Sequence, residues 1–354
     1  MIDRRNFIKQ VSAVGLAGCI PGAMSALTNE SPLIKSSVVP LSSAGSDNKI
    51  WACLMHLSFN FAGGIWTKGN KWGGLGLRPE FETDYTLWSE AIRQMAEKKI
   101  NMVLINLDDA VLWHSHPEIA VKNAWTPERL RDELAIIRKA GIEPIPLLNF
   151  SSCHDAWLRK YSRMVSTSAY YKVCRDLIDE AIQIFDTPRF IHFGMDEETH
   201  MHQSHFDYVI VRQKELWWGD LYFYFAEAMT RGVRPWVWSD YVWHDPDTFF
   251  KMMPKSAVQS NWYYGEKFDK SETYVKAYLD LEKEGYDQIP TGSNDQNNPK
   301  SIGNTVEFCS RQIADNRLLG FMQTFWMPTT SKYRDPILQA INLTGEARIR
   351  FEKK

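Results

Sequence analysis

The sequence has almost no excess of charge of either sign, with 41 Lys and Arg residues against 43 Asp and Glu residues and a net charge of −2. It also lacks a basic stripe or a polybasic tail, which disfavours nucleic acid as a partner. Beyond residues 11–20, no apolar run is long enough to span a bilayer as a helix. No internal repeat is visible, so the 354 residues predict one large domain after a short leader.

Cysteine is scarce, with five residues and no Cys-x-x-Cys pair, which argues against a zinc knuckle or a dithiol redox motif. The four cysteines after Cys19 are widely spaced: Cys53, Cys153, Cys174 and Cys309. An exported protein can form disulfides. However, Cys53 lies in a predicted strand and both Cys174 and Cys309 lie in predicted helices, so we expect buried thiols.

The first residues carry an export pattern. Residues 3–9 contain two adjacent arginines and resemble a twin-arginine signal. The apolar stretch 11–20 that follows is too short to cross a membrane as a helix. We therefore predict a signal peptide over residues 1–26 and an exported protein that is periplasmic, anchored to the outer membrane or extracellular.

The same segment also resembles a lipid-attachment signal. Residues 16–19 read Leu-Ala-Gly-Cys, like a bacterial lipobox, which predicts membrane attachment through a lipid on Cys19. Cleavage after the small residues 23–26 is the alternative. Residues 27–48 are rich in Ser, Pro and small polar residues and predict a flexible tether. The folded domain is then expected over residues 49–354.

From residue 49 onward, apolar strand-like runs alternate with stretches of helical periodicity such as Trp88, Ile92 and Met95. Eight strands are predicted, over residues 51–61, 100–107, 142–149, 190–195, 235–239, 257–263, 288–292 and 320–326. Strands alternating with helices predict a parallel sheet. Eight units over roughly 300 residues match an α/β fold of the (β/α)8 TIM-barrel type. A doubly wound open sheet is the alternative, but residues 62–64 lack the Gly-rich fingerprint it needs.

Capping signals support the helix boundaries. Thr126-Pro127, Asp245-Pro246 and Asp335-Pro336 each place a capping side chain before a proline at the expected first helical position. Gly141 and Gly285 follow the last periodic residue of their helices, where a glycine most easily adopts the left-handed cap conformation.

The C-terminal ends of the strands, where barrels of this type hold their active sites, carry amides, carboxylates and aromatic rings. They carry no Lys or Arg, which disfavours phosphorylated substrates. Asp, Asn and Gln can address sugar hydroxyls in pairs, and flat aromatic faces suit pyranose rings. We therefore expect a carbohydrate partner. The predicted substrate-binding residues at these ends are Asn60, Asp108, His154, Trp238, Asp240, Trp262, Tyr263, Asp295 and Trp326.

Residues 189–198 read as a buried strand that ends in the acids Asp196, Glu197 and Glu198. Burying carboxylates is costly, so this strand should end at a wet or functional surface. Glycosidic hydrolysis usually needs two carboxyl groups, one of them a proton donor. Neighbours in an ideal strand face opposite sides, but past its end Asp196 and Glu197 can reach one pocket, where repulsion and burial raise one pKa. A solvated loop or a helix N-terminus is the alternative.

The segment 192–197, His-x-Gly-x-Asp-Glu, resembles the signature of the family 20 glycoside hydrolases, the β-N-acetylhexosaminidases, at the end of barrel strand four. Residues 95–109 and 142–154 resemble that family's second and third strand regions. Met195 stands where the family has a second glycine, and residues 56–61 lack the family's strand-one arginine. The tryptophans at positions that resemble the family's sugar-stacking residues are Trp238, Trp262 and Trp326.

The resemblance implies an exo-acting, retaining and substrate-assisted hydrolase of β-linked amino sugars that uses no cofactor and no metal. It makes Glu197 the general acid and base. It makes Asp196 the residue that orients the 2-acetamido group, whose carbonyl oxygen attacks the anomeric carbon. His192, His154 and Asp108 would be supporting polar groups near the site.

Three other hypotheses remain open. His200, His202 and His205, together with His192 and Asp196, could form the metal site of a metal-dependent hydrolase or sugar isomerase, although the spacing of the three histidines also fits an exposed loop. The protein could be a non-catalytic glycan-binding lipoprotein that keeps the tryptophans and lacks proton transfer. A glycosidase could instead use a protein nucleophile, such as Asp240 or Asp295, opposite the acid.

Overall fold

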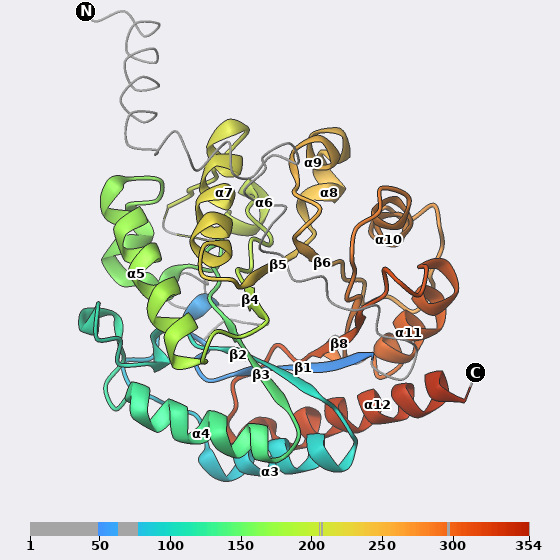
Figure 1. The fold of residues 1–354 in the computed structure, drawn as a ribbon, viewed down its shortest axis with the longest axis horizontal. Coiled ribbons are helices and arrows are strands. Elements are labelled where there is room, and N and C mark those ends of the chain that lie inside the picture. The colour runs from blue at the N-terminus through green and yellow to red at the C-terminus, as the bar shows by residue number, and fades with distance from the viewer. Residues whose placement is uncertain (1–48, 63–76, 205, 207, 296–297, 354) are drawn as a thin grey trace, which may run out of the picture.

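The computed structural model describes residues 49–62, 77–204, 206, 208–295 and 298–353, which form a ring of parallel strands surrounded by helices (Figure 1). The strands are β1 (Ile50–His56), β2 (Met102–Asn106), β3 (Glu143–Leu147), β4 (Phe190–His192), β5 (Arg234–Trp238), β6 (Val258–Ser260), β7 (Thr291–Ser293) and β8 (Gly320–Thr324). Their order is β6-β5-β4-β3-β2-β1-β8-β7. Bridges at Gln259–Gln288 and Trp262–Thr291 bring β6 beside β7, so the barrel nearly closes. The predicted (β/α)8 barrel is confirmed.

The segments that carry the export prediction lie outside the described residues. These are the signal peptide, the lipobox with Cys19 and the tether, all within residues 1–48. Among the helices that the structure describes, none combines the length and the hydropathy needed to cross a membrane.

All eight predicted strands exist, but several end earlier than the apolar runs that predicted them. The first run continues to Phe61, whereas β1 ends at His56 and a 3-10 helix follows over Asn60–Ala62. The fourth run continues to Met195, whereas β4 ends at His192. Phe61 and Met195 are still buried after the chain leaves the sheet. Burial persists without strand pairing there, so hydrophobicity alone overestimates the strand length.

Helices cover the outside of the barrel, and α12 packs against α3 and α11. In Figure 1, α3, α4 and α12 lie together below the strands. Two short helices, α6 (His200–Gln203) and α8 (Tyr241–His244), lie in the loops after β4 and β5. The longer helices are α3 (Tyr85–Glu97), α4 (Pro127–Lys139), α5 (Ser168–Ile184), α7 (Glu215–Met229), α9 (Pro246–Met252), α10 (Thr273–Lys283), α11 (Ser301–Gln312) and α12 (Arg334–Glu352).

Two of the three predicted proline caps are confirmed. The side chains of Thr126 and Asp245 accept hydrogen bonds from backbone N–H groups in the first turns of α4 and α9. The third prediction is wrong, because α12 begins at Arg334 and its first turn already contains Asp335. Gly141 and Gly285 have φ angles of +80° and +78°, as expected for left-handed caps.

The barrel interior and the helical shell form separate apolar layers. Leu54 and Phe190 belong to the interior layer, whereas Met55 packs towards the helices. Because side chains alternate along a strand, His56 and His192, two positions further on, face the interior at the C-terminal mouth. Polar side chains therefore line the mouth of the barrel, next to the apolar side chains that fill its interior.

The cysteines of the described residues confirm the prediction of buried thiols. Cys53, Cys153, Cys174 and Cys309 are all free and buried.

Candidate active site

Asp196 and Glu197 lie at the mouth of the barrel, in a turn after β4 in which several residues have the left-handed backbone conformation. Gly194, Met195 and Glu197 have φ angles of +69°, +73° and +55°. Residues other than glycine rarely adopt this left-handed backbone conformation. A Cβ atom on Gly194 would lie 2.0 Å from Oδ1 of Asn149, so this position needs glycine. The turn breaks the alternation of the strand, and two neighbouring acids can therefore face one side.

His154 lies between the two acids. Its Nε2 atom is 3.3 Å from Oδ2 of Asp196 and 3.3 Å from Oε2 of Glu197. The other oxygen of Asp196 accepts a hydrogen bond of 2.8 Å from Nδ2 of Asn149. Ser151 Oγ donates a hydrogen bond of 2.5 Å to the backbone carbonyl of Asp196. Asp196 is thus buried and fixed in direction, and both carboxylates face the same imidazole nitrogen.

Glu197 is more open than Asp196, with 25% of its side chain exposed. Its Oε1 atom lies 3.3 Å from Nε2 of His202, and its backbone N–H donates to Oδ2 of Asp240 at 3.2 Å. Burial raises the pKa of the Glu197 carboxyl, but hydrogen bonds from His154 and His202 outweigh burial and hold that pKa well below its usual range. Glu197 is therefore ionised in the free protein.

His154 and Asp108 are buried groups with shifted pKa values. Burial lowers the pKa of His154, but the carboxylates of Asp196 and Glu197 outweigh it and hold that pKa well above its usual value. Burial, and then the neighbouring Asp109 carboxylate, raise the pKa of Asp108. Nδ1 of His154 and Oδ1 of Asp108 have no hydrogen-bond partner in the part of the chain that the structure describes. The acids thus stabilise a proton on His154.

Asp240, at the end of β5, lies behind Glu197. Its Oδ1 atom accepts a hydrogen bond of 2.7 Å from Nε1 of Trp262. Burial raises the pKa of Asp240 well above its usual value, and the charges of Asp196 and Glu197 raise it further. The Asp240 carboxyl therefore favours its neutral form.

Aromatic rings from three strand ends contact one another beside the acids. The rings of Trp238 and Trp326 lie 6.0 Å apart, and Nε1 of Trp326 donates to the hydroxyl of Tyr264 at 3.1 Å. The ring of Tyr264 stacks on Trp262 at 5.0 Å. Trp238 also contacts His192, with ring centres 4.6 Å apart. These rings form a continuous aromatic surface at the mouth of the barrel.

Two buried nitrogen atoms near this surface lack partners. Nδ1 of His192 accepts a hydrogen bond of 3.0 Å from the N–H of Gly194, and burial lowers the pKa of His192 to about 3, so its proton sits on Nε2. Nε2 of His192 and Nε1 of Trp238 have no partner among the described residues. Buried donors of this kind are normally satisfied by protein, water or ligand.

Two predicted binding residues are occupied by other contacts. The side-chain amide of Asn60 donates to Asp109 at 2.9 Å and to the carbonyl of Arg78 at 3.0 Å, and its oxygen accepts from the N–H of Arg78. Asn60 therefore joins the loops around β1 and β2. The ring of Tyr263 packs on Phe268 at 5.1 Å, on the side of the helical shell.

Asp295 and Glu198 lie near the mouth but are engaged differently from the two acids. The backbone N–H of Asp295 donates to Ser293 Oγ at 3.0 Å. Burial raises the pKa of Tyr264, and the charges of Asp240 and Asp295 add to this effect. Glu198 forms a buried ion pair with Arg212, whose Nε donates to Oε1 of Glu198 at 2.8 Å. Glu198 therefore stabilises the loop after β4 through its ion pair with Arg212.

Three residues of the site were not among the predicted binding residues. The spacing of the histidines predicts either a metal site or an exposed loop for His202, and neither prediction places it against Glu197. Asn149 follows β3 directly, and its amide holds Asp196. Tyr264 is two residues after Trp262, so the period of two along a strand would have favoured it over Tyr263.

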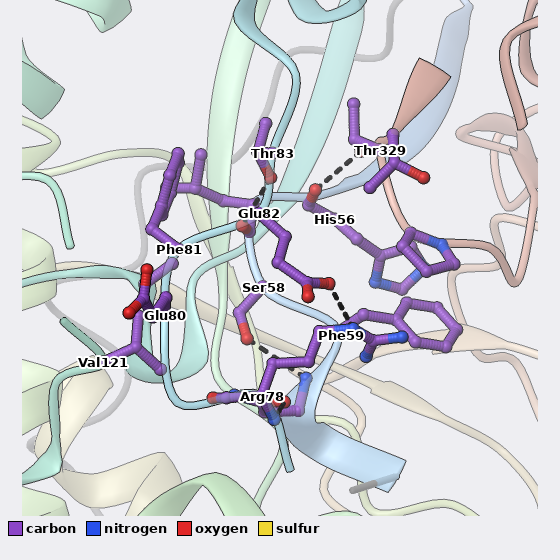
Figure 2. A pocket seen from close by; sticks show the side chains of 15 residues that line it. His56, Ser58, Phe59, Arg78, Glu80, Phe81, Glu82, Thr83, Val121 and Thr329 are labelled. Carbon is purple, nitrogen blue, oxygen red and sulfur yellow. Dashed lines mark hydrogen bonds and ion pairs between the residues drawn. The ribbon is translucent and has the colours of Figure 1, made fainter. Parts of the chain in front are cut away.

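A small hollow lies beside the site, between the end of β1 and residues 78–83 (Figure 2). Figure 2 shows the side chains of Arg78 and Glu82 pointing toward one another, and they form an ion pair. Neither of the two acids lines this hollow. His56 connects it to the aromatic surface, because the ring of His56 lies 5.6 Å from that of Trp326.

One group of side chains near the acids has the composition of a metal site. A ring nitrogen of His154, Sγ of Cys153 and a carboxylate oxygen of Glu197 all lie within 4.8 Å of one another. Among the described residues, His192, His200 and His202 do not belong to any group of three possible metal ligands, and His205 lies outside these residues.

No family model matches the sequence, and no curated protein is significantly similar to it. Solved structures do match. An exo-β-N-acetylglucosaminidase of glycoside hydrolase family 20 from Vibrio harveyi, in complex with N-acetylglucosamine, aligns with a TM-score of 0.58 at 15% identity, over 86% of this chain and 57% of that one. A β-N-acetylhexosaminidase from Bacteroides fragilis aligns with a TM-score of 0.57 at 13% identity, over 84% and 65%.

A family 20 β-N-acetylhexosaminidase from Streptomyces coelicolor gives a similar result, with a TM-score of 0.58 at 12% identity over 84% of this chain and 64% of that one. The chain thus spans less than two thirds of the length of these three proteins. At such low identity the likeness establishes the fold, which is the barrel of these hydrolases.

Proposed function

We propose that the protein is an exported glycoside hydrolase that removes β-linked 2-acetamido sugars from the non-reducing end of a glycan, with retention of configuration. The observation that carries the proposal is the position of His154, whose Nε2 atom is 3.3 Å from both Asp196 and Glu197. The carboxylates of two neighbouring acids therefore face the same position at the mouth of the barrel. Each can act on a different atom of one bound sugar.

In the proposed mechanism, Asp196 orients the 2-acetamido group. Its carboxylate is held by Asn149 and His154 and accepts the N–H of that group, so that the carbonyl oxygen of the substrate attacks the anomeric carbon. Glu197 gives a proton to the leaving oxygen as the glycosidic bond breaks. Because Glu197 is ionised in the free protein, this proton comes from His154, whose Nε2 atom lies 3.3 Å from Oε2 of Glu197. Water then opens the cyclic intermediate with Glu197 as the base.

Asp240 is a poorer candidate for a protein nucleophile. A carboxyl nucleophile must be ionised, whereas burial and the two neighbouring acids raise the pKa of Asp240. Its oxygens also already accept hydrogen bonds from Trp262 and from the backbone of Glu197. This supports the substrate's acetamido oxygen as the nucleophile.

The aromatic surface supports a sugar as the ligand. Trp238, Trp262, Tyr264 and Trp326 contact one another at the strand ends that also carry the acids, and aromatic side chains with a few convergent polar groups are typical of small-molecule sites. The unpartnered nitrogens of His192 and Trp238 offer donors to such a ligand. A non-catalytic glycan-binding protein would share this surface, so only turnover separates the two functions.

The decisive experiment is a screen of aryl β-glycosides with and without a 2-acetamido group. The wild-type protein should cleave the acetamido substrates, and Glu197→Gln should lower kcat by roughly 10²–10⁴-fold while sugar binding and folding persist. Glu307→Gln, the same change at an exposed position on α11, is the control. Full activity of the Glu197 variant would show that another group is the acid, and sugar binding without any turnover would favour the glycan-binding function.

Asp196→Asn tests the second role. It should impair substrates that carry a 2-acetamido group far more than plain glucosides. An equal loss on both classes would indicate a protein nucleophile.

Export and lipid attachment are further proposals, based on residues 3–9 and on Cys19. Both proposals can be tested by expressing the protein in a bacterium grown with labelled palmitate. The wild-type chain should incorporate the label and the Cys19→Ala variant should not. Cell fractionation gives the location of the chain, and a chain that stays in the cytoplasm would contradict the export proposal.

A further inference from the structure

Cys153 lies next to the proposed acid but has no part in the proposed reaction. It sits in the loop after β3, where its backbone N–H donates to Ser151 Oγ at 3.2 Å, and it is buried. Its Sγ atom, a ring nitrogen of His154 and a carboxylate oxygen of Glu197 lie within 4.8 Å of one another. A thiol, an imidazole and a carboxylate thus converge on one point.

We propose that Cys153, His154 and Glu197 form a binding site for a thiophilic divalent cation of the Zn²⁺ type, and that the bound ion inhibits the protein by occupying its acid. The inhibition rests on the proposed function, whereas the binding does not. Sulfur, imidazole nitrogen and carboxylate oxygen are the donor types that Zn²⁺ selects.

The geometry is close to that of a three-ligand zinc site. Bond lengths of about 2.0–2.3 Å place ligand atoms of a tetrahedral site roughly 3.3–3.8 Å apart. Nε2 of His154 and Oε2 of Glu197 are already 3.3 Å apart. Sγ of Cys153 lies within 4.8 Å of a ring nitrogen of His154 and of a carboxylate oxygen of Glu197, so it is the donor that has to move closer when the ion binds.

The charges around the site favour a cation. Oδ2 of Asp196 and Oε2 of Glu197 each lie 3.3 Å from Nε2 of His154. The two carboxylates therefore face the point where a proton or a metal ion can sit. A divalent ion supplies more positive charge than the single proton on His154, and it also stabilises the thiolate of Cys153.

An ion can enter from the mouth of the barrel and find a fourth ligand there. Glu197 is the exposed member of the group, and Nε2 of His202 lies 3.3 Å from its Oε1 atom, with 43% of the His202 side chain exposed. His202 can therefore complete the coordination, or water can occupy that position. Mg²⁺ and Ca²⁺ prefer oxygen ligands and should bind weakly.

The experiment measures Zn²⁺ binding directly, by competition with a chromophoric chelator in a buffer that keeps thiols reduced. The wild-type protein should bind one equivalent, and Cys153→Ala and Cys153→Ser should each weaken binding at least about tenfold. Cys174→Ala removes another buried thiol and His200→Ala removes an exposed histidine beside the site, so both should bind Zn²⁺ like the wild type. Thermal melts verify that each variant is folded.

Activity on the acetamido substrate gives the second readout. Zn²⁺ should inhibit the wild type in proportion to occupancy, Mg²⁺ and Ca²⁺ should not, and Cys153→Ala should keep its basal activity while resisting Zn²⁺. Binding that is absent, unchanged in both Cys153 variants, or lost in His200→Ala would overturn the proposal. Cys153-dependent binding in a protein that cleaves no glycoside would retain the metal site and reject the proposed function.

Discussion

His202 contacts the oxygen of Glu197 that His154 leaves free, and together with His154 this contact keeps the proposed acid ionised in the free protein. Nδ1 of His202 lies 2.8 Å from Oγ1 of Thr199, which orients the ring. The hydrogen bond from His202 contributes to the low pKa of Glu197 in the free protein, against burial, which raises it. A general acid must be protonated, so we infer that substrate displaces His202 when the leaving oxygen reaches Glu197.

His202→Ala should therefore raise the pKa of Glu197, because one stabilising donor is lost while His154 and the neighbouring acids Asp196 and Asp240 remain. The protonated acid then persists to higher pH, and the alkaline limb of kcat/KM against pH should move upward. His200→Ala, on the same short helix, should leave the profile in place. An alkaline limb that moves downward or stays fixed in His202→Ala would contradict the role of His202.

At the scale of elements, the loop between β4 and α7 is held by Arg212. This buried guanidinium binds Glu198 at 2.8 Å and Asp220 at 2.9 Å, and donates to the carbonyl of Phe150 at 2.7 Å. It therefore joins the loops after β3 and β4, which carry His154 and Glu197. The position of the proposed acid depends on an ion pair formed by its neighbour Glu198.

Arg212→Met should lower the free energy of unfolding by about 3–5 kcal/mol, because two buried carboxylates lose their partner. Arg189→Met removes an exposed ion pair with Glu143 and should cost less than about 1 kcal/mol. Urea unfolding followed by circular dichroism measures both. Equal, small effects of the two changes would show that the Arg212 pairs contribute little to the fold.

At the scale of the whole molecule, the last helix, α12, packs against the first helix of the shell, α3. Gln94 of α3 donates to the carbonyl of Leu338 at 2.9 Å. Ile341 is fully buried in the same core cluster as residues of β1 and α3. The end of the described chain is thus built into the shell that surrounds its first strand.

Ile341→Ala should lower the free energy of unfolding by about 2–5 kcal/mol in a single cooperative transition. Ile349→Ala makes the same change on the same helix at a position that is 43% exposed, and it should cost less than about 1 kcal/mol. Thermal and urea melts followed by two probes test this. Separate transitions in the two probes would indicate that α12 unfolds on its own.

Local patterns were sufficient for the elements and for two of the three proline caps. Apolar runs and helical stripes located the strands and helices, and Thr126 and Asp245 cap as their side chains suggest. The prediction for Asp335 was wrong because α12 begins at Arg334, two residues before Pro336. Arg334 pairs with Glu90 of α3, a contact between residues far apart in sequence that no local pattern indicates.

The candidate site was predictable only as a set of strand ends. The sequence brings Asp196 and Glu197 to the end of β4, but their common direction depends on the left-handed residues Gly194, Met195 and Glu197. Asn60 and Tyr263 occupy similar places in the sequence, yet their side chains bind Asp109 and pack on Phe268. For Asn60 no periodicity indicates this outcome, whereas for Tyr263 the period of two along a strand does.

The sequence by itself determined the alternation of strands and helices, hence the barrel and the edge at which polar groups gather, because hydrophobic periodicity is a local property of the chain. The tertiary structure decided which of those groups meet. His154 and Glu197 are distant in sequence, and the contact between them at 3.3 Å exists because parallel strands β3 and β4 end side by side and a strained turn reverses one side chain.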